Sequence, residues 1–246
     1  QAVTITITDN ESAPTVTLAA ASSSIVENSS DTITLTATVS TATFQDVTVS
    51  IDGTGGTGTE GTDFGTVSDI TISAGSTTGT VTFDPTDDSV YEGNETAGIS
   101  VSGVSGGGAS ESGTQAVTIT ITENESAPTV TLSTSGSSIA ENAGSSLTLT
   151  ATLSVATTAD VTVALSTSGT ATEGTDYTDG SGNIDDITIS AGSTTGTVNF
   201  TPTNDSVYEG DETATIAISS VSGGSATESG TQSVTITISE DESAPT

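Results

Sequence analysis

Short runs in which an apolar residue alternates with threonine or serine make up most of this sequence. Residues 33–39 have the sequence Ile-Thr-Leu-Thr-Ala-Thr-Val, and residues 47–51 and 70–72 alternate in the same way. A period of two places successive side chains on opposite faces of a β-strand, so each run has one apolar face and one polar face. A helical period is absent. The pattern therefore predicts an all-β protein whose strands each bury one face.

The spacing of these runs is typical of an antiparallel sandwich with an immunoglobulin-like arrangement. Seven strands are expected in the first half of the chain, at residues 14–18 with an extension at 25–26, and at 31–40, 46–51, 69–73, 77–83, 96–102 and 114–122. The predicted core consists of valine, isoleucine and leucine with a few aromatic residues, namely Phe83, Tyr91, Phe200 and Tyr208.

A repeated phrase divides the chain into units. A Val-Thr-Ile-Thr-Ile strand followed by acidic residues and Ser-Ala-Pro occurs near the beginning, in the middle and at the end, and 114 residues separate Pro14 from Pro128 while 117 separate Pro128 from Pro245. Periods of this length correspond to whole domains in tandem rather than to a solenoid. We predict two copies of one domain, at 13–126 and 127–246, with residues 1–12 as the last strand of a preceding copy. A single large domain with internal symmetry is the alternative.

The charge balance limits the possible partners and chemistry. The chain has 32 acidic residues and no lysine, arginine or histidine, which gives a net charge of −32, and it has no cysteine. Nucleic acid is excluded as a partner because contacts to phosphate need basic side chains. Disulfides and zinc sites are excluded as well. Catalysis would rest on carboxylates alone, so we do not expect an enzyme. The longest apolar runs fall far short of the roughly 18 residues of a membrane span, so direct membrane insertion is not expected.

The acidic residues are concentrated between particular strands. The sequence at 87–96, Asp-Asp-Ser-Val-Tyr-Glu-Gly-Asn-Glu-Thr, recurs at 204–213 with two substitutions. If the predicted strands alternate in direction, 13 of the 15 acidic residues of each copy lie at one pole of the sandwich. Two like charges about 4 Å apart repel by roughly 4 kcal/mol at an effective dielectric constant near 20. Closely spaced carboxylates are ligands that suit calcium, so the pattern predicts calcium ions at this pole.

Three motifs occur in the same order in both copies and resemble the Calx-beta domain. They are Val-Tyr-Glu-Gly at 90–93 and 207–210, Glu-Gly-Thr-Asp followed by an aromatic residue at 60–64 and 173–177, and Ile-Val-Glu or Ile-Ala-Glu at 25–27 and 139–141. The resemblance covers both copies from end to end. It implies immunoglobulin-like sandwiches that bind calcium, known from sodium–calcium exchangers, from integrin β4 and from long arrays in bacterial surface and secreted proteins.

The resemblance also implies particular calcium ligands. In the first copy the matching residues are Glu27, Asp63, Asp88, Glu92 and Glu95, with the main-chain oxygen of Val90. In the second copy they are Glu141, Asp176, Asp205, Glu209 and Glu212, with the main-chain oxygen of Val207. The exchanger domains end their last strand with a run of aspartates, and the matching residues here are Glu123 and Glu125, then Glu240 and Glu242. The longer glutamates leave the number of ions open, at about one to three per pole.

Together these features predict a calcium-binding structural repeat of a long extracellular adhesin stalk or surface fibre. The acidic run at 123–125 leads directly into Ser126-Ala127-Pro128, where one copy joins the next, so calcium is expected to stiffen the joint. The expected partners are calcium ions and neighbouring repeats, at the cell surface or outside the cell. One alternative is a self-assembling filament whose subunits join by strand addition through residues 1–12. A calcium-sensing module is the other.

Overall fold

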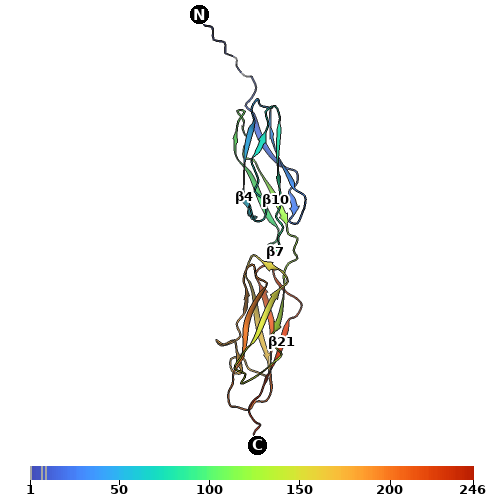
Figure 1. The fold of residues 1–246 in the computed structure, drawn as a ribbon, viewed down its shortest axis with the longest axis vertical. Helices are drawn as coiled ribbons and strands as arrows, with labels where there is room; N and C mark the ends of the chain where they lie inside the picture. Colours follow the sequence, from blue (N-terminus) through green and yellow to red (C-terminus); the bar gives the residue numbers. More distant parts are fainter. Residues whose placement is uncertain (1, 7, 9) are drawn as a thin grey trace. The chain divides into compact units, whose positions relative to one another are not determined.

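The computed structural model describes residues 2–6, 8 and 10–246 (Figure 1). The chain forms two compact units: unit 1 holds the residues up to 88 together with 93–124, and unit 2 holds 89–92 together with 125–246. Every regular element in the described part of the chain is a β-strand, which confirms the all-β prediction. Within the same residues, no helix is long and apolar enough to cross a membrane.

Unit 1 is a sandwich of two sheets. One sheet has the order β6-β3-β1-β9 and the other β2-β10-β8-β4-β5. The strands are β1 (Thr15–Ala20), β2 (Ser24–Val26), β3 (Ile33–Val39), β4 (Val47–Gly56), β5 (Ile70–Ile72), β6 (Thr78–Phe83), β8 (Glu95–Ser105), β9 (Ser110–Glu111) and β10 (Ala116–Thr122). The pairs β1–β9 and β2–β10 are parallel, and the other pairs are antiparallel. The chain changes sheets between β1 and β2, which places β2 beside the last strand.

Unit 2 repeats this arrangement. Its sheets have the orders β16-β18-β13-β11-β20 and β12-β21-β19-β15-β17. The strands are β11 (Thr129–Thr134), β12 (Ser138–Ala140), β13 (Leu147–Leu153), β15 (Val161–Gly169), β16 (Tyr177–Thr178), β17 (Ile187–Ile189), β18 (Thr195–Pro202), β19 (Glu212–Ser222), β20 (Thr227–Glu228) and β21 (Ser233–Ser239). Unit 2 also contains a small parallel pair, β7 (Val90–Tyr91) with β14 (Ala156–Thr157).

The alternation of the sequence decides which face of each strand is buried. In β3, Ile33, Leu35, Ala37 and Val39 are all buried, while the threonines between them face outward. The same pattern in both sheets of a unit closes one core between them. Burying apolar area in this way contributes roughly 25 cal/mol per Å², so the alternating runs supply the main driving force for folding.

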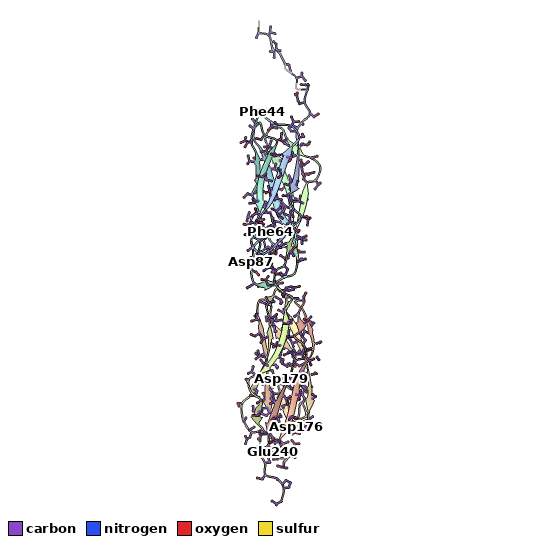
Figure 2. The ribbon with its side chains drawn as sticks, turned by 90° about the vertical axis from the view of Figure 1, so that its right-hand side faces the viewer. Phe44, Phe64, Asp87, Asp176, Asp179 and Glu240 are labelled. Atoms are coloured by element: carbon purple, nitrogen blue, oxygen red, sulfur yellow. The ribbon has the colours of Figure 1, made fainter. Side chains whose placement is uncertain are left out.

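Two of the four predicted core aromatics are not in the core. Phe83 and Phe200 are fully buried, but Tyr91 is only half-buried and Tyr208 is 45% exposed. Phe64 and Tyr177 take the expected places, with ring centroids 5.0 Å from Phe83 and 4.7 Å from Phe200. Figure 2 shows Phe64 within the sandwich of unit 1. The prediction was wrong because Tyr91 lies in the short strand β7 and Tyr208 lies in a loop, and neither segment has an apolar alternation that would specify a buried side.

Strands β4 and β8 extend beyond their predicted ends. They reach residues 56 and 105, whereas the alternation stops at 51 and 102, and the β4–β8 pairing contains two register shifts. Gly56 ends β4 with a φ of 97°, and a Cβ there would lie 2.0 Å from the Thr96 carbonyl oxygen. Only glycine fits such an approach. This glycine, and Gly169 in unit 2, turns the chain into the loop that carries Asp63 or Asp176.

The predicted strand at residues 1–12 remains a prediction. The described residues before β1 form no regular element, and Val3 and Ile5 are more than 80% exposed. Residues 1, 7 and 9 lie outside the described part of the chain. The domain limits at 13–126 and 127–246 also remain a prediction, because the compact units divide the chain differently at 89–92.

Candidate metal centre

Acidic side chains of the described residues form four groups. In each group every residue contributes one carboxylate oxygen, and these oxygens all lie within 4.8 Å of one another. The groups are Glu27, Glu123 and Glu125; Asp63, Glu92 and Glu95; Glu141, Glu240, Asp241 and Glu242; and Asp176, Glu209 and Glu212. Because both copies gather the same sequence positions, the repeat itself encodes the arrangement. The last two groups, called here the Glu240 group and the Asp176 group, lie in unit 2.

The parallel pairing of β12 with β21 assembles the Glu240 group. Both strands end at the same edge of the sheet, with Ala140 opposite Ser239. Glu141 follows β12 directly, and its backbone N–H donates to the Ser239 carbonyl at 3.0 Å. The acidic run 240–242 follows β21. Strand pairing therefore brings together carboxylates that are about a hundred residues apart in the sequence.

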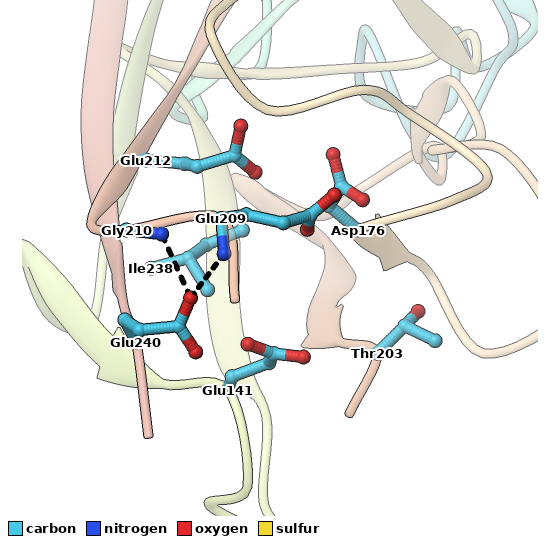
Figure 3. A pocket seen from close by; sticks show the side chains of 8 residues that line it. All are labelled: Glu141, Asp176, Thr203, Glu209, Gly210, Glu212, Ile238 and Glu240. Atoms are coloured by element: carbon cyan, nitrogen blue, oxygen red, sulfur yellow. Dashed lines mark hydrogen bonds between the residues drawn. The ribbon is translucent and has the colours of Figure 1, made fainter. Parts of the chain in front are cut away.

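Glu240 holds this end of the unit together (Figure 3). One of its carboxylate oxygens accepts hydrogen bonds from the backbone N–H groups of Glu209 and Gly210, and the other accepts from Asp241 and Glu242 at 3.0 Å. These N–H donors favour the charged form and lower the pKa of Glu240 to about 2. Glu240 is thus a fixed anion that ties the 209–212 segment to the end of β21.

Glu242 is the least satisfied member of the group. Its Oε2 atom is buried and has no hydrogen-bond partner. The hydrogen bond with the Glu240 carboxylate, followed by burial and the charge of Asp241, raises the pKa of Glu242 to about 7. Glu141 is only 8% exposed, and the chain has no basic side chain to neutralise it. Buried carboxylates are normally paired or bound to metals, so the residues present fit a cation.

Like charges also crowd the Asp176 group. Asp176 lies in the loop before β16, where its Oδ2 accepts from the Thr172 N–H at 2.6 Å. Glu212 begins β19, and burial followed by the charge of Asp176 raises its pKa to about 7. The charge of Asp176 is also the main cause of the raised pKa of Glu209. A cation between the three carboxylates would reverse these shifts.

The two groups of unit 2 line one pocket. Its lining comprises Glu141, Asp176, Thr203, Glu209, Gly210, Glu212, Ile238 and Glu240. Figure 3 shows the carboxylates of Glu209 and Asp176 close together, with Glu141 beside Glu240. Asp176 and Glu240 appear near the same end of unit 2 in Figure 2. The acidic lining of this pocket therefore suits a cation better than an apolar ligand.

The first copy repeats the main contacts. Glu27 is 7% exposed and Asp63 is 9% exposed. The Glu123 carboxylate accepts from the backbone N–H groups of Gly93 at 2.8 Å and Asn124 at 3.0 Å, as Glu240 does from Gly210 and Asp241. Asp63 accepts from the Thr59 N–H at 2.6 Å, as Asp176 does from Thr172.

The structure brings most of the predicted ligands together, and their role as ligands remains a prediction. The predicted residues found in the four groups are Glu27, Asp63, Glu92, Glu95, Glu123, Glu125, Glu141, Asp176, Glu209, Glu212, Glu240 and Glu242. Asp88 and Asp205 are not among these carboxylate groups. The main-chain oxygens of Val90 and Val207 remain predicted ligands. Asp205 nevertheless lies next to the Glu240 group, because its N–H donates to Glu141 Oε1 at 2.9 Å.

Asp205 and Val207 have other contacts in this structure. The Asp205 carboxylate accepts from the Val207 N–H at 2.6 Å, and the Val207 side chain is 56% exposed. In the first copy Asp88 is exposed, and Val90 lies in β7 opposite Ala156. Sequence analysis missed Asp241, which belongs to the Glu240 group and accepts from Asn142 at 2.7 Å. Its place within the acidic run after β21 was the available signal.

The sequence matches one protein family twice. The model of the Calx-beta domain matches residues 9–125 and 123–242. Similar solved structures include CBD12 from CALX1.2, with 16% identity over 91% of this chain and 100% of that chain and a TM-score of 0.39. The calcium binding domain CBD12 of CALX1.1 has 15% identity over 87% and 95%, with a TM-score of 0.38.

A bacterial protein is among the similar structures as well. Invasin, described as a bacterial integrin-binding protein, has 18% identity over 92% of this chain and 40% of that chain, with a TM-score of 0.41. The search of curated proteins gave no match. The family assignment rests on the two sequence matches, which together span nearly the whole chain. The chain therefore belongs to the Calx-beta domain family, of which it carries two copies.

Proposed function

We propose that this chain is a calcium-binding structural repeat of a long extracellular adhesin stalk or surface fibre. The observation that carries the proposal is the acidic cluster that contains the buried Glu141 and the buried Oε2 atom of Glu242, in a chain that has no basic side chain. An uncompensated buried charge is costly, and binding a cation removes the cost. Calx-beta domains are calcium-binding modules, so we propose a binding role and no catalytic one.

Ligand type and spacing favour calcium. All ligands in the groups are carboxylate oxygens, which suit hard cations. Calcium binds oxygen at about 2.3–2.6 Å, so two oxygens on one ion are at most roughly 5 Å apart. The oxygens within each group lie within 4.8 Å of one another. Calcium also takes six to eight oxygens in flexible geometry, and bidentate glutamates from the Glu240 and Asp176 groups can supply them for about two ions.

The position of the site at the end of the last strand supports a role in stiffness. Glu123–Glu125 lead directly into Ser126-Ala127-Pro128, and Glu240–Glu242 lead into Ser243-Ala244-Pro245. A calcium ion bound by Glu240 and Glu242 would restrict the backbone that leaves β21. The proline that follows fixes its own φ and restricts the residue before it. We therefore propose that calcium stiffens the segment between successive repeats.

Calcium binding can be measured directly by isothermal titration calorimetry. We expect saturable binding of calcium, with much weaker heat from magnesium, because magnesium demands a smaller and more regular shell. The double variant Glu141→Gln, Glu242→Gln removes two ligands of the Glu240 group and should lose the binding that belongs to it. Asp31→Asn, an exposed acid outside the four groups, is the matched control. Equal loss in both variants would mean that calcium only screens the overall charge.

A further inference from the structure

Residues 207 and 208 have the same sequence as strand β7, but in this structure they are not paired with another strand. The sequence Ser-Val-Tyr-Glu-Gly occurs at 89–93 and again at 206–210. In the first occurrence Val90 and Tyr91 form β7, which pairs in parallel with Ala156 and Thr157 of β14. In the second occurrence Val207 and Tyr208 form no strand and are 56% and 45% exposed, whereas Val90 and Tyr91 are half-buried.

Strand β14, the partner of β7, also has a counterpart in the first copy that is not paired with another strand. Ala42 and Thr43 occupy the positions of Ala156 and Thr157 in the repeat, and their local contacts agree. The Thr43 hydroxyl donates to the Gln45 carbonyl as the Thr157 hydroxyl does to Ala159, and Gly75 donates to Thr43 as Gly192 does to Thr157. Yet residues 42 and 43 form no strand, and Ala42 is exposed where Ala156 is half-buried.

A groove with a mixed polar and apolar lining surrounds this second segment. Residues 41–44 line a groove in unit 1 together with 11–14 and Gly107. Phe44, at the edge of the groove, is 85% exposed and lies at the opposite end of unit 1 from Asp87 (Figure 2). Successive side chains of a strand point to opposite sides, so one of the two side chains, valine or tyrosine, would enter this groove and remove apolar area from water.

We propose that residues 207 and 208 of one chain pair in parallel with residues 42 and 43 of a second copy, in the register that β7 makes with β14. Val207 then lies opposite Ala42, and Tyr208 lies opposite Thr43 beside Phe44. The two surfaces differ, so the contact is head-to-tail and can continue from copy to copy rather than closing into a symmetric dimer. Backbone and apolar atoms make the contact, so it does not rest on calcium binding.

The contact is small, and the high negative charge of the chain opposes it. The net charge of −32 repels a second copy, but at about 0.15 M salt the repulsion is screened beyond roughly 8 Å. A two-residue strand that contacts one groove gives weak, transient association. Covalent trapping by a disulfide is therefore the appropriate test. Because the chain has no cysteine, any disulfide must join the introduced residues.

The test uses two single-cysteine chains, Ala42→Cys and Val207→Cys, mixed under mild oxidation. Neighbouring strands lie about 4.8 Å apart, within the roughly 4.4–6.8 Å between Cα atoms that a disulfide allows. Because the proposed pairing would hold the two cysteines within disulfide reach, we expect several-fold more heterodimer than the Val90→Cys control mixture gives. Isotope labelling of one chain distinguishes heterodimers from homodimers by mass.

Val90→Cys is the matched control, since Val90 has the same sequence context but is already paired with Ala156. Its mixture with Ala42→Cys should give only the background yield. A heterodimer yield from Val207→Cys and Ala42→Cys no greater than this background would overturn the proposal. A predominance of homodimers joined through one segment would overturn it as well, because that result indicates a symmetric contact.

Discussion

At the residue scale, the carboxylates of the Glu240 group lie close together in a chain that has no basic side chain to pair with them. Glu240 is held as an anion by backbone N–H groups, whereas Glu242, beside it, has a pKa of about 7. The two pKa values differ because N–H donors surround the Glu240 carboxylate, whereas other carboxylates surround that of Glu242. A proton or a metal ion must therefore satisfy Glu242. If calcium binds here as proposed, it competes with protons for the same oxygens.

Glu242→Gln should change stability in opposite directions with and without calcium. In chelator, glutamine removes one charge from the cluster and can donate to Glu240, so the melting temperature should rise. In calcium, loss of a charged ligand should weaken binding by about tenfold or more, so the stabilisation by calcium should shrink. Thermal unfolding by circular dichroism measures both. A variant that shifts the melting temperature equally in the two buffers would contradict a ligand role for Glu242.

The raised pKa values of Glu212 and Glu242 predict a pH dependence that calcium abolishes. Both rise from 4.5 to about 7, so the folded state retains protons that the unfolded state has lost. Without calcium, their contribution to stability is complete below about pH 4.5 and is lost as the pH rises through 7. The melting temperature in chelator should therefore fall over this window, and saturating calcium should remove the decline. An unchanged decline in calcium would show that these carboxylates bind no ion.

At the element scale, strand ends decide where the acidic residues lie. Alternation along β3, β10 and β21 was sufficient to predict these strands and their buried faces, because a period of two leaves one choice of face. The family resemblance implied that Glu141 and Glu240 belong to one site. The pairing of β12 with β21, which brings them together, was not predicted. The exposure of Tyr208 could not be predicted, and the contribution of Asp241 was indicated only by its place in the acidic run after β21. Both depend on the path of a loop, which no period specifies.

Glycines at the ends of β4 and β15 should prove more important for stability than glycines with positive φ whose added Cβ would meet no atom. In Gly169→Ala, the new Cβ would lie 2.0 Å from the Thr213 carbonyl oxygen. The backbone must shift, at a cost of roughly 1–3 kcal/mol in the free energy of unfolding. Gly61→Ala is the control, because Gly61 has a φ of 87° but no atom within 4 Å of the added Cβ. Denaturant unfolding compares the two variants, and equal losses would show that φ alone matters.

At the scale of the whole molecule, two copies of one acidic domain follow each other with little chain between them. The last acidic residue of the first copy, Glu125, is three residues before Pro128. If calcium stiffens this segment, small-angle X-ray scattering should show a narrower distribution of distances in calcium than in chelator at equal ionic strength. Substituting Glu123 and Glu125 by glutamine should remove the difference. Identical scattering in both buffers would leave calcium binding intact but would argue against a role in stiffness.

The most direct test of the central claim is thermal unfolding of the chain in calcium and in chelator, with sodium chloride added to equal ionic strength. A ligand that binds only the folded state stabilises it by about 2.7 kcal/mol per site at a hundred times its dissociation constant. We predict a large rise in melting temperature with calcium that sodium does not reproduce. The same melting temperature in calcium and sodium would contradict the account, because the acidic groups would then bind no specific ion.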